Sequence, residues 1–309
     1  MTMSQTLITS RDPKGLHATG LFEAAYNKSK LDEARAQRLN ERGGELQDGI
    51  AKLIAELSMS NQYANEEVRS SYTYPKEYKG PKLIADQIKV LAKIFDLDPS
   101  HAIEFAKNLP ALPEGAEGWF AIPSVDALAK KHFPEVTDLA QKYCQTVQLV
   151  HAKIAASRSF YNYREGQITP TQLRVHARTA HALDIIAETQ KGDPSRQGGA
   201  GADILIVAAQ LGMRHRGKSV RRAREVFVAN EFGLGSLAVG SIVLTHPERL
   251  VHWEELDMDC SGDEFSPEAD GDFSKSPCFN FRDGKVEFGA RWCDRADGHY
   301  GSASAFLSQ

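Results

Sequence analysis

The chain has 309 residues, which is long enough for one large domain or two ordinary domains with buried cores. Charged residues make up 25% of it, and the formal net charge is only -4. These values exclude a global electrostatic bias toward nucleic acids or membranes, so any electrostatic targeting must be local.

The cysteines and the termini bear on the cellular compartment. Cysteines at positions 144, 260, 278 and 293 form no C-x-x-C pair and show no zinc-ligand spacing, which indicates reduced thiols. Residues 1–14 have no apolar core of signal-peptide length. The longest uncharged run, residues 232–247, is too short and too rich in glycine to span a bilayer. We therefore expect a cytoplasmic protein with no membrane partner.

Helical patterns dominate the first part of the chain. Asp98-Pro99, Ser124 and Thr169-Pro170 place a capping side chain or a first-turn proline before apolar residues at spacings of three and four. We predict a helical domain over residues 1–190. Its expected helices cover residues 21–39, 45–57, 81–95, 99–109, 124–133, 137–160 and 170–190.

Residues 191–202 are rich in glycine and polar side chains and are interpreted as a linker. After it, the pattern predicts a strand over 204–207, helices over 219–231 and 247–256, and a hairpin of 278–281 with 286–292 around Arg282-Asp283-Gly284. We expect Phe306 and Leu307 to pack on the core. The predicted fold class is α+β, in which a helical N-terminal region is followed by a smaller mixed α/β domain over residues 203–309.

Residues 212–219 read Gly-Met-Arg-His-Arg-Gly-Lys-Ser and follow a predicted strand. This spacing, G-x-x-x-x-G-K-[ST], resembles the P-loop of nucleotide-binding proteins. The resemblance implies that Gly212 and Gly217 let the backbone wrap phosphates, that Lys218 reaches the terminal phosphates and that Ser219 binds Mg²⁺. The surrounding sequence departs from that family, because the next apolar run ends in Thr245-His246 and not in an aspartate.

Six lysines or arginines and one histidine lie between Arg214 and Arg224, without an acidic residue among them. On a helix that begins after Ser219, the arginines lie opposite the apolar side chains and are available to a partner. Cations in a first helical turn are disfavoured by up to about 1 kcal/mol, which suggests a bound anion. The alternative is a solvated or internally ion-paired face. The candidate phosphate- or nucleic-acid-binding residues are Arg214, His215, Arg216, Gly217, Lys218, Ser219, Arg221, Arg222 and Arg224.

Residues 254–272 contain nine acidic side chains and no lysine or arginine. Asp257, Asp259, Ser261, Gly262 and Glu268 are spaced in a way that resembles the EF-hand calcium loop, although Pro267 blocks the exiting helix. Two alternatives stay open: an exposed acidic loop, and a segment that docks on the basic stretch. The candidate ligands for Mg²⁺ or Ca²⁺ are Asp257, Asp259, Asp263, Glu264 and Glu268.

Together these patterns favour a binding protein whose residues 214–224 hold a phosphate-bearing partner, with nucleic acid as the favoured class. A second hypothesis is a P-loop-like nucleotide-binding protein or Mg-dependent phosphotransfer enzyme, with Lys218 and Ser219 on phosphate and some of the acidic residues on the metal. A third is a scaffold that binds a protein partner through its helical region.

Overall fold

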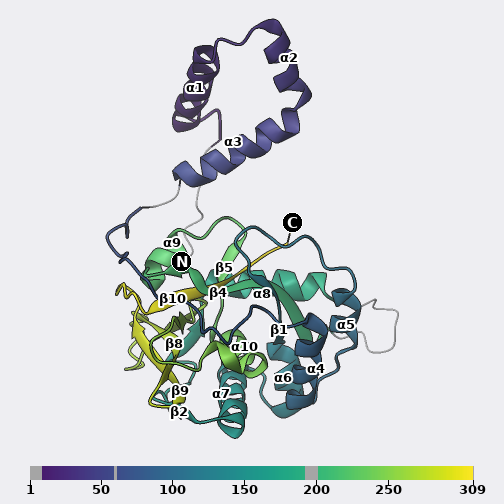
Figure 1. Cartoon of the computed structure of the whole chain (residues 1–309), viewed down its shortest axis with the longest axis vertical. Coiled ribbons are helices and arrows are strands. Elements are labelled where there is room, and N and C mark those ends of the chain that lie inside the picture. Colours follow the sequence, from purple (N-terminus) through teal and green to yellow (C-terminus); the bar gives the residue numbers. More distant parts are fainter. Residues whose placement is uncertain (1–8, 59–60, 192–200, 309) are drawn as a thin grey trace. The chain divides into compact units, whose positions relative to one another are not determined.

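A computed structural model describes residues 9–58, 61–191 and 201–308 (Figure 1). The chain forms two compact units, residues 1–59 and residues 60–309. Helices come first, and a mixed sheet with interspersed helices follows. The predicted α+β fold class is therefore confirmed.

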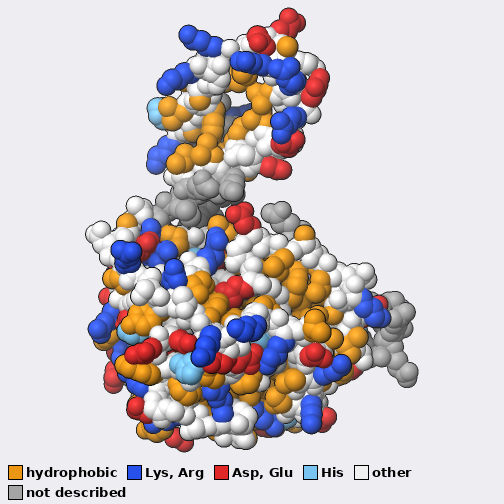
Figure 2. Space-filling model, viewed as in Figure 1, with side chains coloured by type: hydrophobic (Ala, Val, Ile, Leu, Met, Phe, Trp, Pro, Cys, Tyr) orange, Lys and Arg blue, Asp and Glu red, His pale blue; other side chains and the backbone are white. Residues whose placement is uncertain are grey.

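The first unit consists of three helices: α1 (Pro13–Lys28), α2 (Glu33–Glu41) and α3 (Gly43–Ser58). The single helix predicted over 21–39 is divided, because α1 ends at Lys28 and Asp32 caps a new helix by accepting the N–H of Arg35. Apolar side chains gather between the helices (Figure 2), yet α1 and α2 contain no buried residue.

The helices of the second unit pack around one sheet. Ser124 caps its helix as predicted, whereas the helix predicted over 170–190 begins only at Ala177, because residues 173–175 pair in the sheet. The helices are α4 (Ile84–Phe95), α5 (Ser100–Ala106), α6 (Val125–His132), α7 (Leu139–Ser157), α8 (Ala177–Thr189), α9 (Val220–Glu225) and α10 (Ser236–Thr245), with the 3₁₀ turn η1 (Pro247–Arg249).

The sheet is mixed: β10 runs parallel to β6 and β2 parallel to β9, and the other pairs are antiparallel. Its main order is β1-β4-β10-β6-β8-β7-β3, with β5 on β10 and β2 on β9. The strands are β1 (Gly118–Pro123), β2 (Phe160–Asn162), β3 (Leu173–Val175), β4 (Ile204–Arg216), β5 (Glu231–Gly233), β6 (Asp257–Asp259), β7 (Asp263–Phe265), β8 (Lys275–Arg282), β9 (Lys285–Trp292) and β10 (Tyr300–Phe306).

The sheet contains strands from both sides of the predicted linker. β1, from the part predicted to be helical, pairs with β4 along its whole length. Residues 192–200 of the predicted linker lie outside the described residues. The predicted hairpin is confirmed as β8–β9, with Asp283 and Gly284 at positive φ in its turn. Phe306 is buried in β10 as expected.

Helix α10 lies in the middle of the core. Every residue of it except Leu244 is buried, and it packs against α7, α4 and β1. Gly240 permits this approach, because a Cβ there would lie 2.7 Å from Val150 Cγ1. Within the described ranges, no helix is long and apolar enough to cross a bilayer.

Candidate functional site

Residues 212–219 do not form a phosphate-binding loop. β4 extends to Arg216 instead of ending at Val207, because its second half pairs with β10. The amides of this stretch donate to scattered acceptors, so they do not converge on a point where a phosphate could lie. Gly212 and Arg214 donate to Gln210 Oε1, Met213 to Tyr74 OH, Gly217 to Tyr300 O and Ser219 to Glu66 O.

Close backbone contacts explain the two glycines of this motif. Gly212 has a φ of +113°, and a Cβ there would lie 2.8 Å from Gly301 O, where β4 and β10 shift register. Gly217 has a φ of +75°, and its Cβ would lie 2.2 Å from Val68 O. Both positions therefore require glycine for the local fold. The structure thus corrects the P-loop interpretation of the motif.

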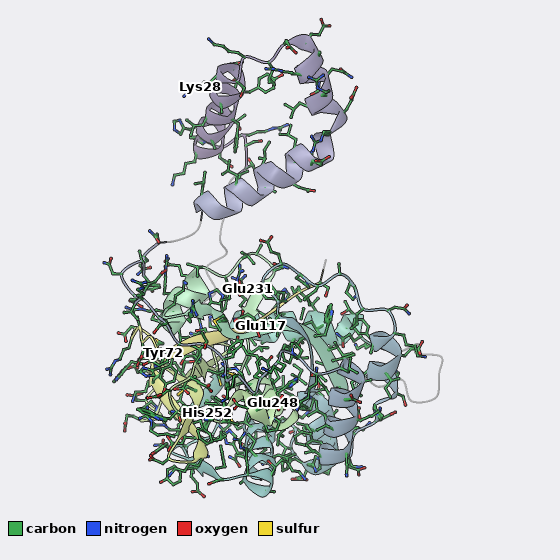
Figure 3. The ribbon with its side chains drawn as sticks, viewed as in Figure 1. Lys28, Tyr72, Glu117, Glu231, Glu248 and His252 are labelled. Carbon is green, nitrogen blue, oxygen red and sulfur yellow. The ribbon has the colours of Figure 1, made fainter. Side chains whose placement is uncertain are left out.

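His215 and Arg214 contact the buried carboxylate of Glu231. Figure 3 labels Glu231 in the second unit. His215 Nε2 lies 2.7 Å from Glu231 Oε1, and Ser304 Oγ donates to the same oxygen over 2.6 Å. Arg214 Nε lies 3.4 Å from Glu231 Oε2. Burial lowers the pKa of His215, so the neutral imidazole donates its Nε2–H to the carboxylate. The P-loop interpretation places His215 in a loop, whereas the structure places it as a buried residue in β4.

The basic residues around α9 pair with acidic residues of the same chain, which favours the ion-paired alternative over a free basic face. The helix spans only residues 220–225 and not 219–231, so the argument from the helix dipole no longer applies. Ser219 Oγ donates to Glu66 over 2.6 Å and also caps α9, so this hydroxyl is already used. The pairs are Arg221 with Glu66, Arg222 with Glu67 and Glu225, and Lys218 with Glu67, and Arg216 donates to Tyr72 O.

A pocket of about 390 Å³ lies beside α9 within the second unit, and we call it the arginine pocket. Arg221 and Arg224 come from the predicted basic stretch, whereas His176 and Arg178 come from the start of α8. The sequence analysis did not join the last two to the basic stretch, because only the tertiary fold brings the start of α8 and α9 to the same pocket. The lining residues are Tyr63, His176, Arg178, Arg221, Arg224, Glu225, Phe227, Gly233 and Ser261.

Arg224 is the most buried of the three arginines, with 15% of its side chain exposed. Its Nε donates to Ser261 O over 2.9 Å and its Nη2 to Asp263 O over 2.7 Å. The carboxylate of its ion-pair partner, Glu264, lies 3.9 Å from Nη1. Burial lowers the pKa of Arg224, so the chain compensates its positive charge only in part.

Arg178 and Arg221 each use only some of their N–H donors in hydrogen bonds within the chain. Arg178 Nη2 donates to the carbonyl oxygens of Val228 and Ala229. Arg221 binds Glu66 through Nε and Nη2, and its guanidinium carbon lies 4.4 Å from the centre of the Tyr63 ring. Among the described residues, the Nη1 atoms of Arg178 and Arg221 take part in no hydrogen bond.

His176 adds a neutral donor to the arginine pocket. Its Nδ1 accepts the backbone N–H of Arg178 at 3.3 Å, which places the proton of the neutral imidazole on Nε2. Burial, with the nearby charge of Arg224, lowers the pKa of His176. The imidazole is therefore uncharged at neutral pH and presents an N–H group.

The acidic residues predicted to bind a cation are not brought together, and most of the predicted exposed loop is buried. Asp257 and Asp259 are buried in β6 and Asp263 in β7, and Glu268 alone of the five is exposed. The docking alternative holds in part, since Arg224 contacts residues 261–264. The other partners are Arg291 for Asp259, Tyr143 and the amide of Ser236 for Asp263, and Arg174 for Glu264.

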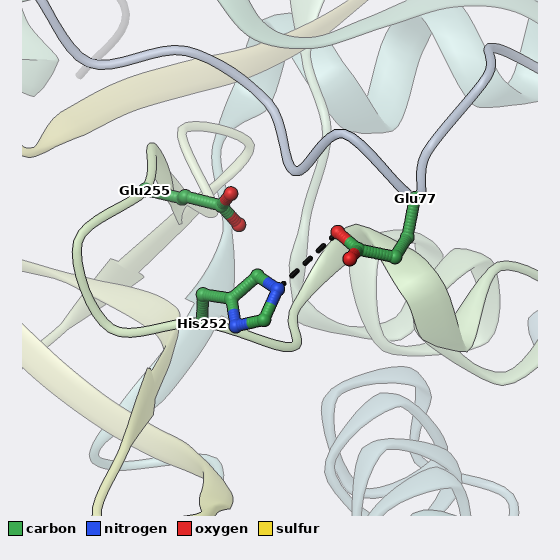
Figure 4. Close-up of side chains that lie close together, drawn as sticks. All are labelled: Glu77, His252 and Glu255. Carbon is green, nitrogen blue, oxygen red and sulfur yellow. Dashed lines mark ion pairs between the residues drawn. The ribbon is translucent and has the colours of Figure 1, made fainter.

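A different group of side chains that could hold a metal ion is present in the part of the chain that the structure describes. Glu77, His252 and Glu255 each offer a ligand atom, and these atoms lie within 4.8 Å of one another (Figure 4). The sequence analysis missed this group because its members are far apart in the chain. The one local signal was His252-x-x-Glu255, at the start of the acidic segment.

Comparisons with known protein families, with curated proteins and with solved structures find no match to this chain.

Proposed function

We propose that this protein binds a phosphate-bearing ligand in the arginine pocket. The observation that carries the proposal is Arg224, a largely buried cation whose paired carboxylate is 3.9 Å away and whose other partners are carbonyl oxygens. A buried charge without full compensation is unfavourable. An anion at this place would supply the missing compensation.

The lining favours phosphate among anions. Three guanidinium groups and the Nε2–H of His176 offer donors to the same pocket, against one lining carboxylate, that of Glu225. The planar guanidinium group matches two oxygens of a phosphate, and such charge-assisted hydrogen bonds are about twice as strong as neutral ones. Arg178 and Arg221 retain Nη1 atoms for this purpose, because their described hydrogen bonds use other donors.

The size of the pocket favours a small ligand. A volume of about 390 Å³ falls in the range of small-molecule sites, which runs from roughly 300 to 1,000 Å³. Tyr63 and Phe227 add aromatic surface to the lining. Arg222 and Lys218 are engaged with acidic residues and do not extend the pocket into a basic track. We therefore favour a phosphomonoester or mononucleotide, and binding of a nucleic-acid strand stays a separate prediction.

The test is a ligand panel measured by isothermal titration calorimetry at low salt. Inorganic phosphate and AMP should bind with one site per chain, and adenosine should not, because it lacks the anionic group. A 16-nucleotide DNA strand with and without a 5′-phosphate forms the second comparison. Failure of both phosphate and AMP to bind contradicts the proposal. Equal binding of the two DNA strands, with no binding of AMP, would favour a nucleic-acid protein instead.

A further inference from the structure

A second candidate site lies elsewhere in the second unit, and it does not depend on the arginine pocket. Glu77 lies in the turn after Pro75, and His252 and Glu255 lie in the segment between η1 and β6. None of the three lines the arginine pocket. The two segments therefore form a candidate site that is separate from the arginine pocket.

One backbone hydrogen bond joins the two segments, and Arg249 ties the second of them to β4. The backbone N–H of Leu256 donates to Thr73 O over 2.9 Å. Arg249, which is fully buried, donates to Leu256 O over 2.7 Å and to Leu211 O in β4 over 2.9 Å. The backbone that carries His252 and Glu255 is thus fixed to the backbone near Glu77. Side chains on fixed backbone lose less entropy when they converge on a ligand.

The spacing of the side chains suits a small cation. His252 Nε2 lies 3.3 Å from Glu77 Oε2, and Figure 4 shows the Glu255 carboxylate turned toward the same imidazole. Bonds of 2.0 to 2.2 Å in a tetrahedral zinc site place neighbouring ligand atoms about 3.3 Å apart. One ligand pair already has this separation, and the whole set lies within 4.8 Å.

The carboxylate of Glu255 provides a second observation, independent of the spacing. Its Oε2 is shielded from solvent and has no hydrogen-bond partner in the part of the chain that the structure describes. The ion pair of His252 with Glu77 does not satisfy this oxygen, because it engages the other carboxylate.

We infer that Glu77, His252 and Glu255 form a binding site for a divalent transition metal ion of the Zn²⁺ type. An imidazole nitrogen with two carboxylates is a ligand set for zinc, whereas Mg²⁺ and Ca²⁺ prefer oxygen ligands alone. The two carboxylates balance the charge of the ion. Three protein ligands leave the fourth tetrahedral position to water or to a further ligand.

The experiment is a calorimetric titration of the full, tag-free chain with Zn²⁺ after removal of metals by chelation. We expect one zinc ion per chain, and a loss of affinity of at least about tenfold in both His252→Gln and Glu255→Gln. His299→Gln is the matched control, because His299 forms a similar exposed pair with Asp297 at 3.4 Å. This control should bind zinc as the wild type does.

Two further measurements keep the inference testable if a variant does not fold. Co²⁺ bound to the wild type should give visible absorption typical of nitrogen and oxygen ligands, without the near-ultraviolet band of a thiolate. Anomalous scattering at the zinc edge should place the ion between His252 Nε2 and the two carboxylates. No stoichiometric zinc binding, undiminished binding by both variants, or an ion located elsewhere would overturn the inference.

Discussion

His151 is a buried histidine whose replacement should remove part of the acid sensitivity of the fold. It lies on α7 with its ring centre 4.2 Å from that of Phe288 and 5.4 Å from that of Phe160. Neither ring nitrogen has a hydrogen-bond partner among the described residues. Burial therefore lowers the pKa of His151 to about 3, from 6.5. The folded protein holds this imidazole neutral where the unfolded chain would protonate it.

The sign and size of the effect follow from proton linkage. Below pH 6.5 the unfolded state binds a proton that the folded state does not, so stability falls as the pH falls and the loss is complete near pH 3. The full pKa difference corresponds to about 5 kcal/mol. Between pH 7 and pH 5 this one group should remove about 2 kcal/mol from the free energy of unfolding.

The assay is urea unfolding of the wild type, His151→Phe and His151→Leu at both pH values. The variants should lose about 2 kcal/mol less than the wild type on going from pH 7 to pH 5. The free energy of unfolding of the variants at pH 7 does not test the linkage. Removing two unsatisfied ring nitrogens raises this free energy, whereas changing the packed volume of the side chain lowers it. His181→Leu, at an exposed position on α8, is the control and should behave as the wild type. An equal pH-dependent loss in all four proteins would refute this reasoning.

Two further predictions concern the fold. Gly217→Ala should lower the free energy of unfolding by more than about 2 kcal/mol, because the φ of Gly217 is +75° and the new methyl group would meet Val68 O. The control Gly289→Ala should change this free energy by less than about 0.5 kcal/mol, because the nearest atom to its new methyl group is Cys278 Sγ at 3.8 Å. Equal stability of the two variants in urea would contradict the structural role of Gly217. Residues 60–309 contain the main buried cluster. This segment alone should therefore unfold cooperatively in urea, at the same midpoint as the main unfolding transition of the full chain. An absent or strongly shifted unfolding transition would contradict that expectation.

The parts of the fold that the sequence predicted are those with local signals. The β8–β9 turn was identified because Asp283-Gly284 favours positive φ, and the α6 cap because Ser124 precedes an amphipathic segment. Helix α10 was not predicted, because it is apolar on all sides and shows no helical periodicity. β4 was predicted too short, because pairing with β10 overrides the polar character of residues 212–216.

The candidate site was predictable only in part, and for a similar reason. Charge density identified Arg221 and Arg224, but their partners come from distant segments. Glu66 engages Arg221 although 155 residues separate the two, and no local pattern encodes that contact. His176 and Arg178 enter the same pocket because α8 lies beside β5. Local charge therefore identified residues of the pocket without identifying the pocket.

The most direct test of the central claim is the affinity of inorganic phosphate for variants of the arginine pocket. Arg178→Gln and Arg221→Gln each remove a charged donor, so the dissociation constant should rise at least about tenfold in each. Arg282→Gln, at an exposed position in the β8–β9 hairpin, controls for the loss of one positive charge and should leave the constant unchanged. Calorimetry on the three variants and the wild type gives this comparison directly. Phosphate affinity that is the same in all four proteins would contradict the account.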